Sequence, residues 1–383
     1  MQESLVIGGS NGIGLAITLE LQKKGGVVHV IDKTKNEMLD SYNNIHFCQF
    51  NLLNSDFSFL EQCKNIDTLI ITAGFGRITP FEDLLEQEIQ NNFQVNCIAL
   101  LKVLHFFFQK MKEKKHFFCA VMGSIAGLIS SPLIATYAAT KAAVCNAIES
   151  LNIELEMAGT ENRILNVSPG SIRGTKFNGG NNNLNDLADL AQTILNKMEE
   201  RQTLYIPQYE EVYHGVLERY HQDPRQFGKQ SYQYKMESGR ICTRPQLKIG
   251  YLSGTFDLFH IGHLNLLRRA KQYCDYLVVG VHKDASHKGK STFVSYEERC
   301  AIVNSIKYVD KVIPSEKEDC DVYLKGIVKY DYLFVGSDYK GTERFNRYEQ
   351  IFADKGVEIV YFPYTQGTSS SQLREALSAI SNQ

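Results

Sequence analysis

The sequence lacks an excess of charge of either sign. Its 383 residues carry 41 Lys and Arg against 43 Asp and Glu, which leaves a formal net charge of −2. This balance gives no electrostatic reason to expect nucleic acid or an anionic membrane as a partner. Long apolar runs are also missing, because the most apolar helical stretch, 98–108, contains Lys102 and His105 and is too short to cross a bilayer.

Paired cysteines and an export signal are missing as well. The nine cysteines include no Cys-x-x-Cys pair, and an odd number in a chain of this length argues against a disulfide framework. No basic segment leads into an apolar core after Met1, so we expect no signal peptide. Reduced thiols in a cytoplasmic protein fit best. The length of the chain predicts two domains.

The N-terminal stretch has the pattern of a dinucleotide-binding turn. A predicted strand over 5–7 leads into a glycine-rich loop and then into a predicted helix over 15–23. Glycines in such a loop let the backbone turn sharply and let a pyrophosphate approach the start of the helix. The loop residues expected to contact the cofactor are Gly8, Ser10, Asn11, Gly12, Ile13 and Gly14.

The residue after the next predicted strand, 27–31, bears on the choice of nicotinamide cofactor. Asp32 can accept hydrogen bonds from the adenosine ribose and would repel a 2′-phosphate. This favours NAD(H) over NADP(H), although the neighbouring Lys33 keeps NADP(H) as an alternative.

Three polar residues then suggest carbonyl chemistry. Ser124 follows a predicted strand over 117–122, and Tyr137 and Lys141 lie four residues apart, on one face of a predicted helix. An ammonium beside a phenol favours the phenolate and is expected to lower the tyrosine pKa. Tyr137 could then act as general acid toward a carbonyl oxygen that Ser124 holds by a hydrogen bond.

With the glycine loop upstream, residues 2–207 resemble the short-chain dehydrogenase/reductase family. The resemblance implies that Asn96 is a fourth catalytic residue, which holds a proton-relay water through its helix. It also implies contacts to the adenosine side of the cofactor from Asn51, Ala73 and Gly74, and to the nicotinamide side from Pro169, Gly170 and Ile172. Arg173 and Lys176 would suit a phosphorylated substrate, with solvated surface charge as the alternative.

The stretch Gly254–His263 predicts a second anion-binding turn. A predicted strand, 247–252, precedes it, and a predicted helix, 264–270, follows it. The N–H groups at a helix start and the helix dipole favour a phosphate there. His260 and His263 would both face that anion.

Residues 247–377 resemble glycerol-3-phosphate cytidylyltransferase, on this turn and on Ser295–Arg299, Tyr308–Pro314 and Val335–Tyr339. The resemblance implies that Lys288 contacts the acceptor phosphate and that Mg²⁺ is held largely by the triphosphate. No protein metal cluster is expected. The implied CTP contacts are Thr255, Phe256, His260, His263, Lys290, Asp338, Thr365, Gly367, Ser369 and Ser370. Tyr364 replaces a family arginine, which removes a cation from the nucleotide site. Other differences from the family lie on the acceptor side and suggest an acceptor other than glycerol 3-phosphate.

These patterns predict an α/β protein with two doubly wound parallel-sheet, Rossmann-like domains, the second a smaller His-x-Gly-His nucleotidyltransferase fold. We expect a reductase domain over 1–221, a polar linker over 222–244 and a cytidylyltransferase domain over 245–383. A homo-oligomer is also expected.

The functional hypothesis is a bifunctional enzyme that makes a CDP-alditol. A ketose phosphate would be reduced with NAD(P)H, and the alditol phosphate would then react with CTP. Ribulose 5-phosphate is the first choice of ketose and dihydroxyacetone phosphate the second. An ATP-using adenylyltransferase fused to an unrelated reductase, and a scaffold that only senses nucleotides, are the alternatives.

Overall fold

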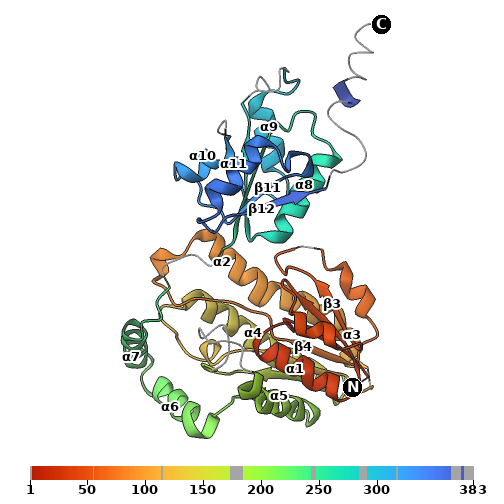
Figure 1. Ribbon diagram of the computed structural model, residues 1–383. Helices are drawn as coiled ribbons and strands as arrows, with labels where there is room; N and C mark the ends of the chain where they lie inside the picture. Colours follow the sequence, from red (N-terminus) through yellow and green to blue (C-terminus); the bar gives the residue numbers. More distant parts are fainter. Residues whose placement is uncertain are drawn as a thin grey trace. The chain divides into compact units, whose positions relative to one another are not determined.

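The computed structural model describes residues 2–54, 56–113, 115–172, 184–242, 247–283, 291–315, 318–363 and 372–374. The chain divides into two compact units, Met1–Pro245 and Gln246–Gln383, and each is described by itself (Figure 1). None of the helices in these ranges is both long enough and apolar enough to span a membrane.

A parallel seven-stranded sheet forms the centre of the first unit, in the order β3-β2-β1-β4-β5-β6-β7. Its strands are β1 Glu3–Ile7, β2 Val27–Asp32, β3 Ile45–Gln49, β4 Thr68–Ile71, β5 Phe118–Met122, β6 Ile164–Val167 and β7 Leu204–Tyr205. The central strands are covered on both faces, which explains why their sequences are continuous apolar runs. The strand order reverses between β1 and β4, and the carboxyl ends of these two strands border the crevice where such sheets bind ligands.

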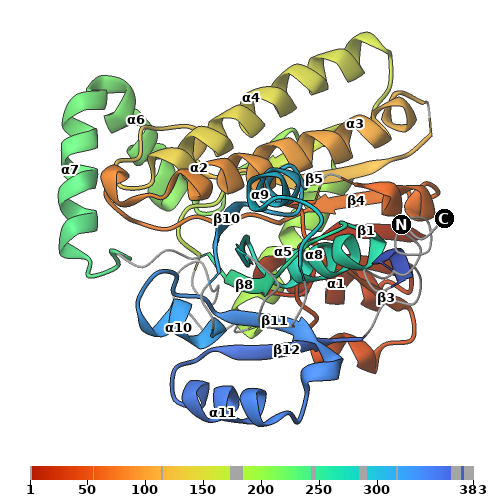
Figure 2. The same ribbon diagram turned by 90° about the horizontal axis from the view of Figure 1, so that it is seen from above.

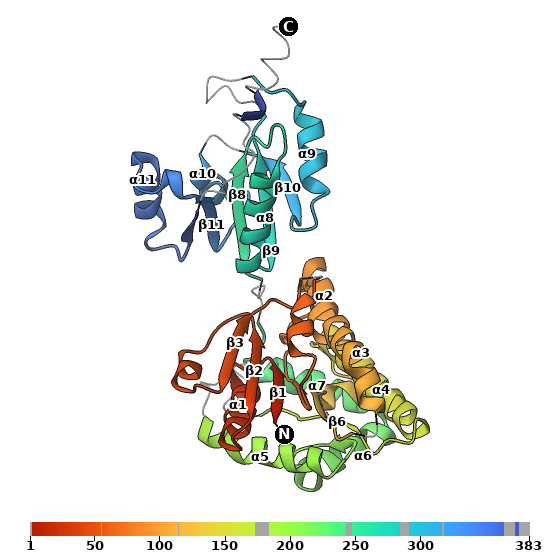
Figure 3. The same cartoon turned by 90° about the vertical axis from the view of Figure 1, so that its right-hand side faces the viewer.

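Helices cover both faces of this sheet. They are α1 Gly12–Lys23, α3 Ala99–Lys112, α4 Ala135–Met157 and α5 Leu184–Glu199. The first unit also contains α2 Glu86–Phe93, α6 His214–Gln222 and α7 Pro224–Glu237. Leu15 of α1 and Leu195 of α5 belong to the core on one face, whereas Phe107 of α3 and Ile148 of α4 belong to the core on the other. Figures 2 and 3 show α1 and α3 on opposite sides of the sheet. Short 3-10 helices cover Glu37–Ser41, Ser58–Cys63 and Phe81–Asp83.

The second unit repeats this plan with five parallel strands in the order β10-β9-β8-β11-β12. They are β8 Ile249–Gly254, β9 Tyr276–Val281, β10 Lys311–Pro314, β11 Tyr332–Gly336 and β12 Glu358–Phe362, and the helices are α8 Ile261–Tyr273, α9 Tyr296–Asn304, α10 Asp319–Leu324 and α11 Glu343–Phe352. Leu267 of α8 and Val303 of α9 pack on one face, and Val322 of α10 and Phe345 of α11 pack on the other (Figure 2). The predicted class of two parallel-sheet α/β units is confirmed. The strand order here reverses between β8 and β11.

The segment that we expected as a linker, 222–244, carries α7 and clusters with the first unit. Asp223 caps α7, because its side chain accepts the Gln226 N–H at 2.9 Å, and Pro224 occupies the first turn. No residue of α7 is fully buried, so no hydrophobic period marks it in the sequence. The Asp223-Pro224 pair is the sequence pattern that could have predicted the start of this helix.

Candidate active sites

The glycine loop joins β1 to α1 at the carboxyl edge of the first sheet. Gly8 has a φ of +86°, and a Cβ there would lie 2.6 Å from the Ala73 nitrogen. A Cβ on Gly14 would overlap the Gly8 carbonyl oxygen. Asn11 is the N-cap of α1, and Gly12, Ile13 and Gly14 form its first turn. A side chain at Gly8 or Gly14 would clash, so the loop packs closely against Thr72 and Ala73 at the end of β4. This close packing leaves the N-terminus of α1 at the sheet edge, where a pyrophosphate could approach it.

Asp32 ends β2 beside this loop. One of its carboxylate oxygens accepts the Ser10 N–H at 3.1 Å, and the other accepts the Thr34 N–H at 3.4 Å. Burial raises the pKa of Asp32, and these hydrogen bonds oppose the rise. The buried Ser10 hydroxyl has no hydrogen-bond partner within the described ranges, and a buried hydroxyl normally has one. The glycine cradle, the Ser10 hydroxyl and Asp32 together fit a bound dinucleotide.

The predicted adenosine-side residues lie next to the same crevice. Phe50 donates its N–H to the Asp32 carbonyl at 2.9 Å, which brings the following residue, Asn51, close to the end of β2. The Asn51 side chain accepts the Leu53 N–H at 3.0 Å. Ala73 donates its N–H to the Ile7 carbonyl at 3.2 Å.

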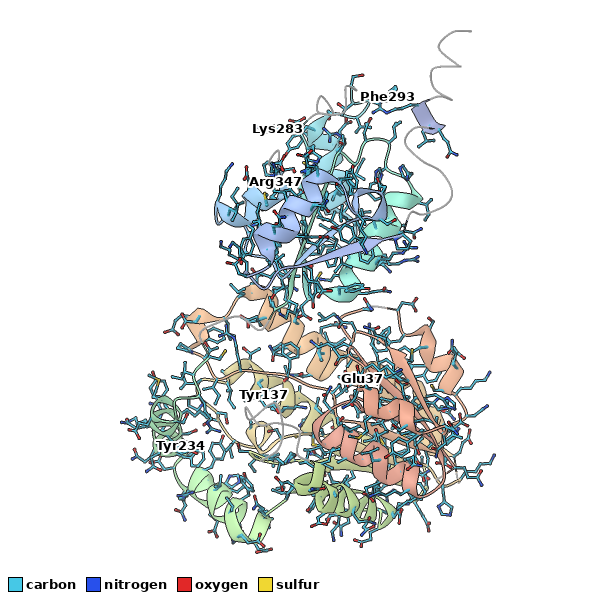
Figure 4. All side chains as sticks on the ribbon, in the orientation of Figure 1. Glu37, Tyr137, Tyr234, Lys283, Phe293 and Arg347 are labelled. Atoms are coloured by element: carbon cyan, nitrogen blue, oxygen red, sulfur yellow. The ribbon has the colours of Figure 1, made fainter. Side chains whose placement is uncertain are left out.

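Ser124, Tyr137 and Lys141 are brought together at the carboxyl end of β5. Ser124 follows β5, and the other two lie in the first two turns of α4; Figure 4 shows Tyr137 on this helix. Ser124 and Tyr137 share a side-chain hydrogen bond. The Lys141 ammonium lies 5.8 Å from the Tyr137 ring centroid and donates to the Met122 carbonyl at 2.7 Å. A phenol, a hydroxyl and an ammonium thus converge on one region.

The pKa of Tyr137 differs from the expectation. Burial raises it to about 12, and the hydrogen bond with Ser124 only partly opposes this. Burial also lowers the pKa of Lys141 to about 8, because its side chain is almost fully enclosed. The expected lowering of the phenol pKa by Lys141 is wrong for this structure, because loss of solvent around Tyr137 raises the pKa more than its hydrogen bond with Ser124 lowers it.

Asn96 lies in a π-helix, Gln94–Ile98, between α2 and α3. Its amide accepts the Phe75 N–H at 2.9 Å and donates to the Phe75 carbonyl at 2.8 Å. A Cβ on Gly74 would lie 3.3 Å from both the Asn96 oxygen and the Lys141 nitrogen. π segments inside helices frequently mark functional sites. Here the π segment holds the loop after β4 against the catalytic candidates.

The predicted nicotinamide-side loop follows β6. Ser124 donates to the Pro169 carbonyl at 3.5 Å, and Ile172 packs on the core beside α5. A Cβ on Gly170 would overlap the hydroxyl of Tyr213, which lies in a second π-helix, Tyr209–Tyr213. Sequence reasoning missed Tyr213, because it reaches Gly170 only when the chain after β7 folds back.

In the second unit the signature turn connects β8 to α8 through an unusual backbone. Phe256 and Leu258 have φ values of +54° and +49°, a left-handed conformation that non-glycine residues rarely adopt. Asp257, between them, is 3% exposed and accepts the N–H groups of Phe293 and Val294 at 3.1 and 3.0 Å. The surrounding fold therefore holds the turn in a strained shape, as is common at ligand sites.

The two histidines lie at the start of α8 with their rings stacked, 4.0 Å between centroids. His260 is the N-cap, and its Nδ1 accepts the Gly262 N–H at 3.0 Å. Its Nε2 must therefore carry the proton when the ring is neutral. Burial lowers the pKa of His260, which favours this neutral form. The backbone N–H of His260 points to His263 Nδ1 at 3.4 Å.

Two arginines that the sequence analysis did not single out as site residues hold this turn. Arg299 is fully buried and donates to the carbonyls of Thr255 at 2.5 Å, His282 at 2.8 Å and Lys283 at 2.8 Å. Arg374 donates to the Asp257 carboxylate at 2.5 Å. The Thr255 hydroxyl is buried, without a hydrogen-bond partner among the described residues. Arg299 belongs to the Ser295–Arg299 motif. The contact between Asp257 and Arg374 could not be predicted from a local pattern, because 117 residues separate them.

Only some of the remaining predicted nucleotide contacts lie within the residues that the structure describes. Asp338 lies in a 3-10 helix, Ser337–Tyr339, directly after β11, and is exposed at the edge where the strand order reverses. Six predicted residues fall outside the described ranges: Lys288, Lys290, Thr365, Gly367, Ser369 and Ser370. The basic pair Arg173 and Lys176 also falls outside them.

Comparisons with known proteins divide the chain in the same way. The short chain dehydrogenase family matches residues 2–186, and the Cytidylyltransferase-like family matches residues 251–376. The glycerol-3-phosphate cytidylyltransferase of Bacillus subtilis (strain 168) is 39% identical over 132 residues, which are 33% of this chain and 95% of that enzyme. The Staphylococcus aureus (strain NCTC 8325 / PS 47) enzyme of the same name is 36% identical over 130 residues, 32% of this chain and 90% of that enzyme.

The first unit is similar to a solved structure. A short chain dehydrogenase from Burkholderia cenocepacia J2315 in complex with NADP superposes with a TM-score of 0.50, covering 60% of this chain and 99% of that one. Its sequence identity is 20%, so this likeness concerns the fold alone.

Proposed function

The chain belongs to the short-chain dehydrogenase family through its first unit and to the cytidylyltransferase-like family through its second, and from this premise we propose that it makes a CDP-alditol. It is an enzyme that joins an oxidoreductase domain to a cytidylyltransferase domain. One observation supports the proposal. A site of the carbonyl-reductase type lies on the same chain as a domain similar to glycerol-3-phosphate cytidylyltransferases. An alditol phosphate is the compound that the first site could release and the second could consume.

In the first reaction, a ketose phosphate and NAD(P)H would give an alditol phosphate and NAD(P)⁺. A bound nicotinamide would supply the hydride for this reduction. Tyr137, protonated at neutral pH because its pKa is about 12, gives its proton to the carbonyl oxygen. Ser124 donates a hydrogen bond to that oxygen, and Lys141 adds positive charge beside it. Asn96 positions the loop after β4 through its two bonds to Phe75.

The cofactor would lie along the carboxyl edge of the first sheet. We assign the pyrophosphate to the glycine loop and the adenosine ribose to Asp32, with the nicotinamide toward Tyr137. The carboxylate of Asp32 supports NAD(H) as the preferred cofactor. The proposed cofactor contacts are Gly8, Ser10, Asn11, Gly12, Ile13, Gly14, Asp32, Asn51, Ala73, Gly74, Pro169, Gly170 and Ile172.

In the second reaction, a phosphate oxygen of the alditol phosphate would attack the α-phosphorus of CTP. The bond to the β-phosphate breaks, and pyrophosphate leaves. His260, whose Nε2 carries the proton, donates to the phosphates together with His263 and the N-terminus of α8. Lys288 is assigned to the acceptor phosphate. Mg²⁺ would be held mainly by the triphosphate, as the resemblance implies.

The substrate proposal is tested with purified protein, CTP, reduced cofactor and a panel of ketose phosphates. We expect ribulose 5-phosphate to be reduced and mass spectrometry to detect CDP-ribitol. Dihydroxyacetone phosphate, which would give CDP-glycerol, is the second candidate. Formation of CDP-ribitol from ribitol 5-phosphate, with no ketose phosphate reduced, would reject the two-step proposal. Pyrophosphate release with ATP in place of CTP would reject the choice of nucleotide.

Asp32→Asn is expected to shift cofactor preference toward NADPH. The amide still accepts the Ser10 N–H but no longer repels a 2′-phosphate. The ratio of kcat/KM for NADPH to that for NADH should rise by about tenfold, the effect of about 1.4 kcal/mol. Steady-state kinetics with both cofactors measure this ratio. A wild-type enzyme that already prefers NADPH would contradict the assignment.

The reductase rate is expected to fall as the pH rises through about 8. Burial lowers the pKa of Lys141 to about 8, so its ammonium is charged below that pH and neutral above it. Tyr137, with a pKa of about 12, keeps its proton over this range. The measurement is kcat for NAD(P)H oxidation between about pH 6 and pH 9.5. In Lys141→Arg the rate should no longer fall as the pH rises through about 8, whatever its absolute value, because arginine stays charged. A wild-type profile flat to the upper limit would refute the assignment.

A further inference from the structure

The segment after α6 reaches the loops that surround Tyr137. Lys235, on the last turn of α7, donates to the Pro132 carbonyl at 2.8 Å, and Pro132 lies in the loop between Ser124 and Tyr137. In the next residue of that loop, the Leu133 carbonyl accepts the Thr79 N–H at 2.7 Å. One face of α7 therefore lies against the loop that precedes the catalytic tyrosine.

A second contact ties the end of this segment to the opposite loop. Cys242 donates its N–H to the Ile78 carbonyl at 2.8 Å, and the buried Arg77 side chain donates to the Cys242 carbonyl. Arg77 is fixed by a two-pronged ion pair with Glu88, both bonds being 2.8 Å. A Cβ on Gly76 would lie 2.7 Å from the Tyr137 ring, so this loop packs directly on the tyrosine. Residues 235–242 thus border both loops that enclose Tyr137.

Lys235 is an unusual cation for such a place. It is half-buried, and in the described part of the chain its ammonium has no carboxylate within ion-pair distance and bonds only to the Pro132 carbonyl. Burial and, to a lesser extent, the nearby positive charge of Arg240 together lower the pKa of Lys235 to about 8. A desolvated cation beside a second cation is stabilised by an anion.

We propose that Lys235, supported by Arg240, binds the phosphate group of the reductase substrate and so selects phosphorylated ketoses. This inference rests on the proposed reduction of a ketose phosphate and adds the residue that recognises the phosphate. A dianionic phosphate would provide the negative counter-charge for the Lys235 ammonium, and charge-assisted hydrogen bonds to phosphate are strong. The helix that holds this lysine lies in the segment that composition alone suggested was a linker.

The test compares ribulose 5-phosphate with ribulose in the wild type and in Lys235→Met. We expect kcat/KM for ribulose 5-phosphate to fall by about tenfold to a hundredfold, mostly through KM, as for loss of a charged hydrogen bond. The value for ribulose should stay within about twofold, since that substrate has no phosphate to lose. If ribulose is reduced too slowly to measure, the division of the loss between KM and kcat decides. Lys235→Arg should retain most of the activity.

Lys229→Met is the matched control, because Lys229 lies on the same helix but is exposed. It should change neither substrate's kinetics. Equal losses on both substrates, or a loss in kcat alone, would show that Lys235 is only structural. An unchanged KM for ribulose 5-phosphate would overturn the inference while leaving the proposed function intact. A wild-type enzyme that reduces no ketose phosphate would instead defeat the proposed function, and the inference with it.

Discussion

Reduction of ribulose 5-phosphate is expected to slow by about a hundredfold to ten-thousandfold when Tyr137 is replaced by Phe, the range typical of a lost general acid. The ring that packs on Gly76 is kept, so only the phenol proton and its hydrogen bond with Ser124 disappear. The loss should appear in kcat, because the proton moves in the transition state. Following NAD(P)H absorbance at saturating substrate measures it.

Cytidylyl transfer provides the internal control for this variant. Pyrophosphate release from CTP and ribitol 5-phosphate should be unchanged in Tyr137→Phe, because the two units have separate hydrophobic cores. Tyr42→Phe removes a hydroxyl from the same unit outside the proposed site and should affect neither reaction. Retention of reductase activity within about tenfold in Tyr137→Phe would remove the tyrosine from the mechanism.

Cytidylyl transfer is expected to slow by about a hundredfold to a thousandfold in His260→Asn, as when one donor to a developing charge is removed. Asparagine is a good helix N-cap and can still accept the Gly262 N–H, so the change removes the Nε2 donor while the start of α8 keeps its cap. Pyrophosphate release with CTP and ribitol 5-phosphate reports the rate, and NAD(P)H oxidation should be unaffected.

A pair of substitutions at the same position separates chemistry from stability. His260→Ala should lose transfer to the same degree, but it should also cost about 1 kcal/mol of stability, because alanine cannot cap the helix. Urea denaturation of both variants measures the difference. If His260→Asn transfers cytidylyl groups at the wild-type rate, the imidazole does not act on the phosphates and the proposed role of the turn fails.

Local sequence patterns predicted most of the fold and one part of each site. The strand before the glycine loop, predicted over 5–7, is part of β1, and the strand predicted over 27–31 is part of β2. Tyr137 and Lys141 share a helix face because their spacing is a property of any α-helix. Such features depend on neighbouring residues, so they can be predicted without knowledge of the rest of the chain.

Other features were not predicted. α7 buries no complete side chain, so hydrophobic periodicity could not reveal it, although its Asp-Pro cap could have. Tyr213 meets Gly170, and Arg374 meets Asp257, only through the way that distant segments return to the sheet edge. The contact between Lys235 and Pro132, 103 residues apart, belongs to the same class.

The sequence by itself determined that the chain forms two parallel α/β units, one beginning with a glycine turn and the other with a His-x-Gly-His turn. Both are consequences of backbone geometry and helix spacing within a few residues. Only the tertiary structure decided the ionisation of the site, with the pKa of Tyr137 raised and that of Lys141 lowered. The reason is physical, since burial and long-range partners set the cost of a charge, and neither can be read from residues that are neighbours in the chain.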